Sequence, residues 1–283
     1  MLADMHTHSS FSPDADRGAD IEKMALRAAE LGLGILTVTD HCDLNFRFSE
    51  SEHAYPDYLL CDRDMFGSLG YALKSIEAVT ALKERYPVLR CGIELGQLVQ
   101  APDTAADLAS DLRLDFVIGS LHMNRGKPDF YWIEYNKMDS SELTALLDAY
   151  FEEQLEVCRT ADFDVLGHLT YPLRYIVGKY GIPVELTRWE GIIEDIFRAL
   201  IGRGKGIEIN TSGLRQEYDR TFPDLGLVRL YRQLGGEILT LGSDAHRIED
   251  IGSGLQAGAE LAKQAGFDYM TVFTGRKPEF VKL

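Results

Sequence analysis

The chain has 283 residues, and its hydrophobic share of 45% and charged share of 26% are typical of soluble globular proteins. No apolar run approaches the roughly 18 residues of a membrane-spanning helix, and the N-terminal residues lack the pattern of a signal peptide. The formal net charge of −16 argues against a general nucleic-acid-binding protein, because such proteins carry a basic face.

Short β-rich runs alternate with longer amphipathic runs along the chain. The predicted strands are residues 2–8, 35–41, 88–96, 116–122, 165–170, 206–211 and 238–246. The predicted helices are residues 19–31, 67–85, 104–112, 141–160, 186–202, 223–234 and 249–265. A strand–helix unit that occurs seven times predicts a parallel sheet, and unbroken alternation favours a closed α/β barrel over an open sheet. No shift in composition marks a boundary, so we expect a single domain over residues 1–283.

Two long irregular segments, residues 43–65 and 123–138, follow predicted strands. Loops of this length after strands often cover a substrate. In the second segment the stretch "DFYWIEYN" has aromatic side chains that could line a pocket or pack within the loop, and Arg125 and Lys127 are further candidate phosphate contacts. Asp103, Asp139 and Asp16 lie near predicted helix starts, where short polar side chains cap backbone N–H groups.

Six of the seven histidines lie at or near the ends of predicted strands. The C-terminal ends of barrel strands line one mouth, which holds the active site in barrels of parallel strands. A single strand-end histidine is more often structural, so the prediction depends on the joint pattern of H-x-H first and D-x-H last. Imidazoles and carboxylates without thiolates suit zinc, iron or manganese. The predicted metal-binding set is His6, His8, His41, Glu94, His122, His168, Asp244 and His246.

Two other residues keep open alternatives. Asp40 either caps a helix or orients a ligand histidine, and Glu208 is buried in a strand for a structural reason or belongs to the site. His53 lies in a loop, where a solvated side chain is expected. The four cysteines are scattered without metal-binding spacing, so we expect reduced thiols and a cytoplasmic protein.

The motifs H-x-H, S-x-D-A, T-D-H, G-I-E, G-S-x-H, G-H and S-D-A-H occur in this order from His6 to His246. This set resembles the PHP (polymerase and histidinol phosphatase) superfamily. The resemblance implies a distorted (β/α)7 barrel with three divalent metal ions at its mouth. It also implies a third N-terminal ligand six residues after His8, which is Asp14, so that Asp16 remains a helix cap. The implied ligands are His6, His8, Glu94 and Asp244 for one metal, Glu94, His122 and His168 for the second, and Asp14, His41 and His246 for the third.

Within the superfamily the chain resembles the stand-alone histidinol-phosphate phosphatases. "GHLTYPLRY" and "NTSGLR" place Arg174 and Arg215 after two strands, where that resemblance implies arginines that bind the substrate phosphate. Glu94, Asp244 and these two arginines are the expected catalytic residues. The implied activity is hydrolysis of L-histidinol phosphate in histidine biosynthesis. The alternatives are a phosphoesterase for nucleotides or other small phosphomonoesters, a nuclease, and a non-catalytic binding protein; the sequence does not give the oligomeric state.

Overall fold

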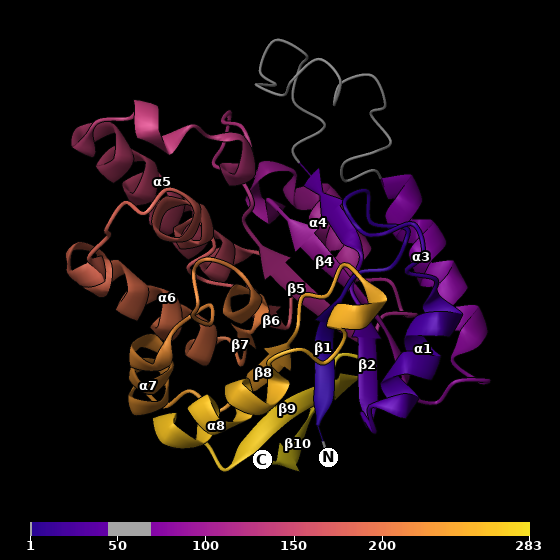
Figure 1. Cartoon of the computed structure of the whole chain (residues 1–283). Coiled ribbons are helices and arrows are strands. Elements are labelled where there is room, and N and C mark those ends of the chain that lie inside the picture. The colour runs from indigo at the N-terminus through magenta and orange to yellow at the C-terminus, as the bar shows by residue number, and fades with distance from the viewer. Residues whose placement is uncertain (1, 45–68) are drawn as a thin grey trace.

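Parallel strands form the centre of the molecule and helices surround them (Figure 1). The structure, a computed structural model, describes residues 2–44 and 69–283. The strands of the central sheet follow the order β1-β2-β4-β5-β6-β7-β8, and β3 pairs with β4 beyond the end of β2. These strands are β1 Ala3–Thr7, β2 Ile35–Val38, β3 His41–Asp43, β4 Leu89–Gly96, β5 Phe116–Ser120, β6 Val165–Leu166, β7 Gly206–Asn210 and β8 Leu239–Gly242.

The first and last strands of the sheet meet at a seam that closes the barrel. Thr7 and Ala245 form a single parallel bridge there. The amide of Asp244 donates to the carbonyl of His6 at 2.8 Å, and the amide of His8 donates to Ala245 at 2.8 Å. The seam therefore lies just past the end of β8, which distorts the ring. The predicted distorted (β/α)7 barrel is confirmed.

Amphipathic helices cover the outside of the sheet (Figure 1). In α1 the buried side chains Ile21, Met24, Ala25 and Ala28 recur at spacings of three and four residues, which places them on one face. None of the described helices is long and apolar enough to cross a membrane. The helices are α1 Ile21–Glu30, α3 Leu69–Leu82, α4 Pro102–Ala109, α5 Ser140–Thr160, α6 Glu190–Gly202, α7 Leu225–Gln233 and α8 Leu255–Ala265.

Helix caps follow the sequence in one case and depart from it in two. Asp139 caps α5 and forms a capping box with Glu142. The prediction that Asp16 caps the first helix is wrong, because Asp20 accepts from two N–H groups of the first turn of α1. Asp16 instead accepts from the amide of Gly18 at 2.6 Å, in the turn before the helix. Helix α4 begins at Pro102 without a side-chain cap, so Asp103 lies inside its first turn.

Two predicted strands end much earlier than the sequence suggests. Predicted strand 165–170 is reduced to β6, and predicted strand 238–246 is reduced to β8. After β8 the chain turns sharply, with Asp244 in the left-handed region at φ 52°. After β6 it passes into a short π-helix, Arg174–Lys179. The polar residues that follow these strands therefore lie on turns at the barrel mouth.

An antiparallel hairpin that the sequence analysis does not predict follows the last helix. It consists of β9 Tyr269–Thr274 and β10 Lys277–Lys282, and it lies beside both chain ends (Figure 1). The Arg276 side chain donates to both oxygens of Asp164, the residue before β6, at 2.9 and 2.7 Å. The hydroxyl of Thr271 accepts from the amide of Leu239 at the start of β8. The hairpin thus packs where the strands begin, opposite the mouth.

Candidate active site

The barrel mouth brings together the histidines that follow the predicted strands. Each side chain comes from a strand end or from the turn after it, so the fold of the barrel alone places them near one another. His53 lies outside the described residues. The six histidines of the mouth are His6, His8, His41, His122, His168 and His246.

A first group of candidate metal ligands combines side chains from β1, from β4 and from the turn after β8. His6 and His8 lie two residues apart at the end of β1, and their Nε2 atoms are 3.0 Å apart. Oε2 of Glu94, from β4, lies 3.3 Å from Nε2 of His6 and 3.5 Å from Nε2 of His8. Oδ1 of Asp244, from the turn after β8, lies 3.8 and 3.4 Å from the same two atoms. Two imidazoles and two carboxylates therefore face one small volume.

A second group shares Glu94 with the first. Nε2 of His122 lies 3.2 Å from Oε1 of Glu94, and Nε2 of His168 lies 2.9 Å from the same oxygen. The two ring nitrogens are 3.4 Å apart. Ser120, at the end of β5, donates to this oxygen at 2.6 Å.

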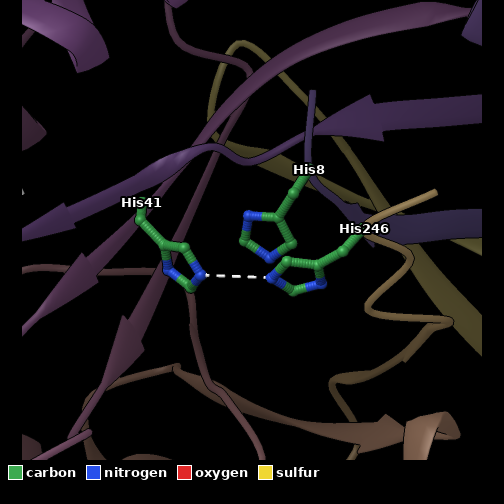
Figure 2. Close-up of side chains that lie close together, drawn as sticks. All are labelled: His8, His41 and His246. Carbon is green, nitrogen blue, oxygen red and sulfur yellow. Dashed lines mark hydrogen bonds between the residues drawn. The ribbon is translucent and has the colours of Figure 1, made fainter. Parts of the chain in front are cut away.

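A third group lies nearer the solvent. Nε2 of His41 and Nε2 of His246 are 3.4 Å apart, and Oδ2 of Asp14 lies 3.6 Å from the first and 3.2 Å from the second. Figure 2 shows His41 and His246 on either side of His8, with their ring nitrogens facing each other. The ring of His8 stacks on both, with centroids 4.1 Å apart in each case.

The donor atoms have the spacing of metal ligands. Two nitrogens bound tetrahedrally to zinc at about 2.0–2.1 Å lie about 3.4 Å apart. The second and third groups each have such a nitrogen pair at 3.4 Å. Oε2 of Glu94 is buried among ring nitrogens of His6, His8 and His41, but among the described residues none of these contacts has the geometry of a hydrogen bond. A buried carboxylate oxygen in this state is costly unless a cation binds it. These residues therefore fit divalent cations.

Charges at the mouth are strongly coupled. Burial alone would raise the pKa of Glu94, but the neighbouring imidazoles, His6 foremost, hold it well below its usual range. Burial alone would lower the pKa of His122, but Asp43 and Glu94 raise it to about 10. Burial lowers the pKa of His8, and neutral imidazole is the form that binds metal.

Two carboxylates orient histidines by contacting Nδ1, the ring nitrogen that faces away from Glu94. Glu208, in β7, accepts from Nδ1 of His6 at 2.7 Å and from the amide of His168 at 2.9 Å. Asp43, at the end of β3, contacts Nδ1 of His122 at 2.8 Å. In both cases Nε2 of the histidine is left facing Glu94. The alternative that Glu208 belongs to the site therefore applies. The sequence analysis missed Asp43, although its place two residues after His41 on the same short strand could have indicated it.

Asp40 stabilises the turn that carries His8 and His41. Its carboxylate accepts from the amide and hydroxyl of Ser9 and from the hydroxyls of Ser12 and Ser75, at 2.5–2.7 Å. The Ser12 oxygen in turn lies 3.1 Å from Nδ1 of His8 and accepts from the amide of His41 at 3.1 Å. Of the two alternatives for Asp40, the orienting role is the one that the contacts support.

The two arginines named by the sequence analysis have different environments. Nη2 of Arg174 donates to Oδ2 of Asp244 at 2.9 Å and to the hydroxyl of Ser212 at 2.7 Å. Arg215 donates to the backbone carbonyls of Ser243 and Asp244 at 2.7 and 2.8 Å. Arg174 lines the cavity at the mouth, whereas Arg215 lies behind the turn that carries Asp244.

A cavity of about 440 Å³ opens over these groups, a size that suits a small molecule. Part of its lining is Asp14, His41, His122, His168, Asp244 and His246. The rest includes Asp129, Tyr131, Trp132, Tyr171, Arg174 and Tyr175. Asp129, Tyr131 and Trp132 come from the loop "DFYWIEYN", whose other aromatics Phe130 and Tyr135 are buried, so the loop both lines the pocket and packs internally.

Comparisons with known proteins agree with this geometry. A family model described as PHP domain matches residues 4–212. A protein of Thermotoga maritima named "Probable histidinol-phosphatase" is 27% identical over 283 residues, which is 100% of each chain. The histidinol-phosphatase of Lactococcus lactis is 26% identical, over 97% of this chain and 95% of that protein.

A solved structure shares the fold over the same length. The crystal structure of the L. lactis histidinol phosphate phosphatase, complexed with zinc, L-histidinol and phosphate, has a TM-score of 0.76 at 26% identity, and the match covers 98% of each chain. The family model reaches from β1 past β7, and the barrel brings Asp244 and His246 to the residues within it. The chain therefore belongs to the PHP domain family.

Proposed function

We propose that this chain is a metal-dependent phosphoric monoester hydrolase that converts L-histidinol phosphate to L-histidinol and phosphate. The observation that carries the proposal is one cavity lined by both the imidazole–carboxylate groups and the Arg174 guanidinium. Relatives named histidinol-phosphatase over the full length support the substrate. The L. lactis structure, which contains zinc, L-histidinol and phosphate, supports it further.

We propose three divalent cations, each zinc, iron or manganese, at the three groups. Supporting observations are the nitrogen spacing of the second and third groups and the place of Glu94 between the first two. The proposed ligands are His6, His8, Glu94 and Asp244 for the first, Glu94, His122 and His168 for the second, and Asp14, His41 and His246 for the third.

Hydrolysis of a phosphomonoester is very slow in water, so the site has to lower a large barrier. Bound divalent cations would supply a water of pKa about 7 and electrostatic stabilisation of the phosphoryl oxygens. Glu94 and Asp244 hold the first group in place, and Arg174 offers the cavity a planar guanidinium that can form paired hydrogen bonds to phosphate. No side chain of the mouth has to become phosphorylated in this scheme.

Arg215 has a second proposed role. Each of its two Nη atoms donates to a carbonyl and carries another N–H, so it can hold the turn of Asp244 and still donate to a phosphate at the edge of the site. We therefore propose both arginines as phosphate ligands, with Arg174 in the more direct position.

We also propose the wider setting expected from the sequence. The whole of residues 1–283 forms one PHP domain, since the hairpin β9–β10 packs on the barrel. The enzyme serves histidine biosynthesis in the cytoplasm; no disulfide links the cysteines of the described residues, which accords with a reducing compartment. Its net charge of −16 disfavours nucleic acid as a substrate.

The test is phosphate release from L-histidinol phosphate, nucleoside monophosphates and single-stranded DNA, with metal analysis of the same sample. We expect kcat/KM for L-histidinol phosphate to exceed the values for nucleotides by orders of magnitude, and DNA to stay intact. Equal rates on nucleotides would favour a general phosphomonoesterase. Full activity of a sample shown to contain no metal would contradict the metal-dependent mechanism.

A further inference from the structure

One carboxylate that lines the cavity, that of Asp129, has no role in the mechanism proposed above. Asp129 precedes the short 3₁₀-helix Phe130–Trp132, and its Oδ1 accepts from the amide of Tyr131 at 2.7 Å. Among the described residues no lysine, arginine or histidine side chain forms a hydrogen bond or ion pair with it. This cap accounts for one of its two oxygens and leaves the other for a ligand.

The other carboxylates of the cavity lining are engaged by cations or imidazoles. Asp14 contacts His41 and His246, and Asp43 contacts His122. Asp244 contacts three histidines and Arg174. Asp129 is the carboxylate of this lining that forms no hydrogen bond or ion pair with a basic or imidazole side chain of the described chain.

The Asp129 carboxylate faces the interior of the cavity. Burial and, next in size, the charge of Asp129 raise the pKa of Tyr171, which lines the cavity and follows β6. Burial raises the pKa of Asp129 itself to about 7. The charge of His122 acts against this rise, but no described cation forms an ion pair with the carboxylate. A half-buried carboxylate with aromatic neighbours and no ion pair is a favourable site for an organic cation.

We propose that Asp129 binds the α-ammonium group of the substrate and thereby selects amino-alcohol phosphates over simple phosphomonoesters. The inference rests on the proposed function and deepens it. In L-histidinol phosphate the amino group is attached to the carbon next to the one that bears the phosphate ester. A phosphate placed against Arg174 and the histidine groups leaves the ammonium within the same cavity, where Asp129 is the carboxylate that is not already engaged.

The test compares two substrates that differ in the ammonium group alone. These are L-histidinol phosphate and 3-(imidazol-4-yl)propyl phosphate, assayed with the metal-loaded wild type and with Asp129→Asn. The amide still accepts the Tyr131 N–H, so the cap is kept while the charge is lost. We expect the ratio of the two kcat/KM values to fall about 10- to 100-fold, which is the worth of one hydrogen bond to a charged group.

Asp139→Asn is the matched control, because Asp139 caps α5 in the same way, is exposed and lies outside the cavity. It should leave the ratio unchanged. A ratio that Asp129→Asn leaves at the wild-type value, with equal losses on both substrates or none, would overturn the inference.

A second pair of substrates separates this inference from the proposed function. O-phosphoethanolamine and ethyl phosphate also differ in an ammonium group, and neither contains the imidazole. If the wild type does not hydrolyse L-histidinol phosphate, the proposed function fails. The inference then stands if wild type prefers O-phosphoethanolamine and Asp129→Asn removes the preference, and it falls if the preference persists or is absent.

Discussion

Glu94 is the side chain on which the three groups of the mouth converge. Its Oε1 faces His122 and His168, while its Oε2 faces His6 and also lies 2.8 Å from Nδ1 of His41. A carboxylate in this position can bind two cations through separate oxygens. Its orientation is fixed by the hydroxyl of Ser120, so its geometry is set before any ligand binds.

Glu208→Gln should weaken metal binding although Glu208 is not a proposed ligand. The carboxylate accepts from Nδ1 of His6, which fixes the ring and increases the basicity of Nε2. An amide keeps the size and loses the charge, so we expect metal affinity at the first group to fall about 10- to 100-fold. Competition with a chromogenic chelator measures the affinity, and circular dichroism checks that the variant is folded.

Glu279→Gln, on the exposed face of β10, is the control and should bind metal as the wild type does. Wild-type affinity in Glu208→Gln would show that this carboxylate only packs the barrel interior.

The sequence was sufficient to predict the side chains that form the three groups of the site, but not all the contacts that orient them. Eight of the nine metal-site candidates follow from strand ends, whereas Asp14 follows from the family resemblance. The structure places the nine side chains together. The spacing from His41 could have placed Asp43 at the mouth, and Glu208 is a sequence alternative, but the histidines that they contact could not be predicted. Those contacts depend on which side chains oppose each other between strands distant in sequence. The position of Asp129 likewise depends on how its loop folds back over the mouth.

At the scale of elements, glycines make room where side chains of the site cross the strands. Gly242, the last residue of β8, lies against Glu208 and His6, and a Cβ there would overlap Oε1 of Glu208 and lie 2.5 Å from Cβ of His6. Gly96, the last residue of β4, has no room for a Cβ because the carboxylate of Asp43 occupies that space. Both contacts involve pairs that orient a histidine.

Gly242→Ala should therefore reduce metal content and stability together. The added methyl group pushes Glu208 and His6 apart, and overpacking of this kind costs about 1–3 kcal/mol. Thermal unfolding with and without a chelator, together with elemental analysis, measures both effects.

Gly191→Ala is the control that separates crowding at Gly242 from a general effect of replacing glycine by alanine. Gly191 lies in the first turn of α6 with open space around it, and alanine favours a helix by about 0.8–1 kcal/mol over glycine. It should be neutral or stabilising. A Gly242→Ala protein with wild-type metal content and melting temperature would contradict the steric argument.

The strands and helices with strong hydrophobic periodicity could be predicted from the sequence. The ends of some strands and the C-terminal hairpin could not. Buried strands such as β5 and amphipathic helices such as α1 leave a clear pattern. The ends of β6 and β8 are predicted too late, because residues after them, such as Leu169 and Ala245, stay buried although the chain has left the sheet. The hairpin was missed because β10 is largely exposed and shows little hydrophobic alternation.

For the whole molecule, metal removal should lower the melting temperature. Carboxylates and imidazoles from six strands or their adjoining turns meet at one mouth. A cation bound there joins these groups in the folded state, and the unfolded chain has no such site. One site at 100 times its dissociation constant contributes about 2.7 kcal/mol. At about 2–4 °C per kcal/mol for a chain near this size, we expect a fall of about 5–10 °C.

Differential scanning calorimetry before and after chelation measures the shift. Zinc or manganese added back should restore the melting temperature, whereas calcium, which prefers oxygen ligands in larger number, should not. An unchanged melting temperature in a sample shown by elemental analysis to be metal-free would contradict the coupling.

The seam between β1 and β8 brings together site residues that are synthesised far apart in time. His6 and His8 are synthesised more than 230 residues before Asp244 and His246, whose side chains complete the groups that they begin. The hydrogen bonds that join Asp244 to His6 and His8 to Ala245 can form only after residues 244 and 245 have been synthesised. A nascent chain that has not reached Asp244 and His246 therefore lacks ligands from the first and third groups. The complete site requires the barrel to close between β1 and the turn after β8.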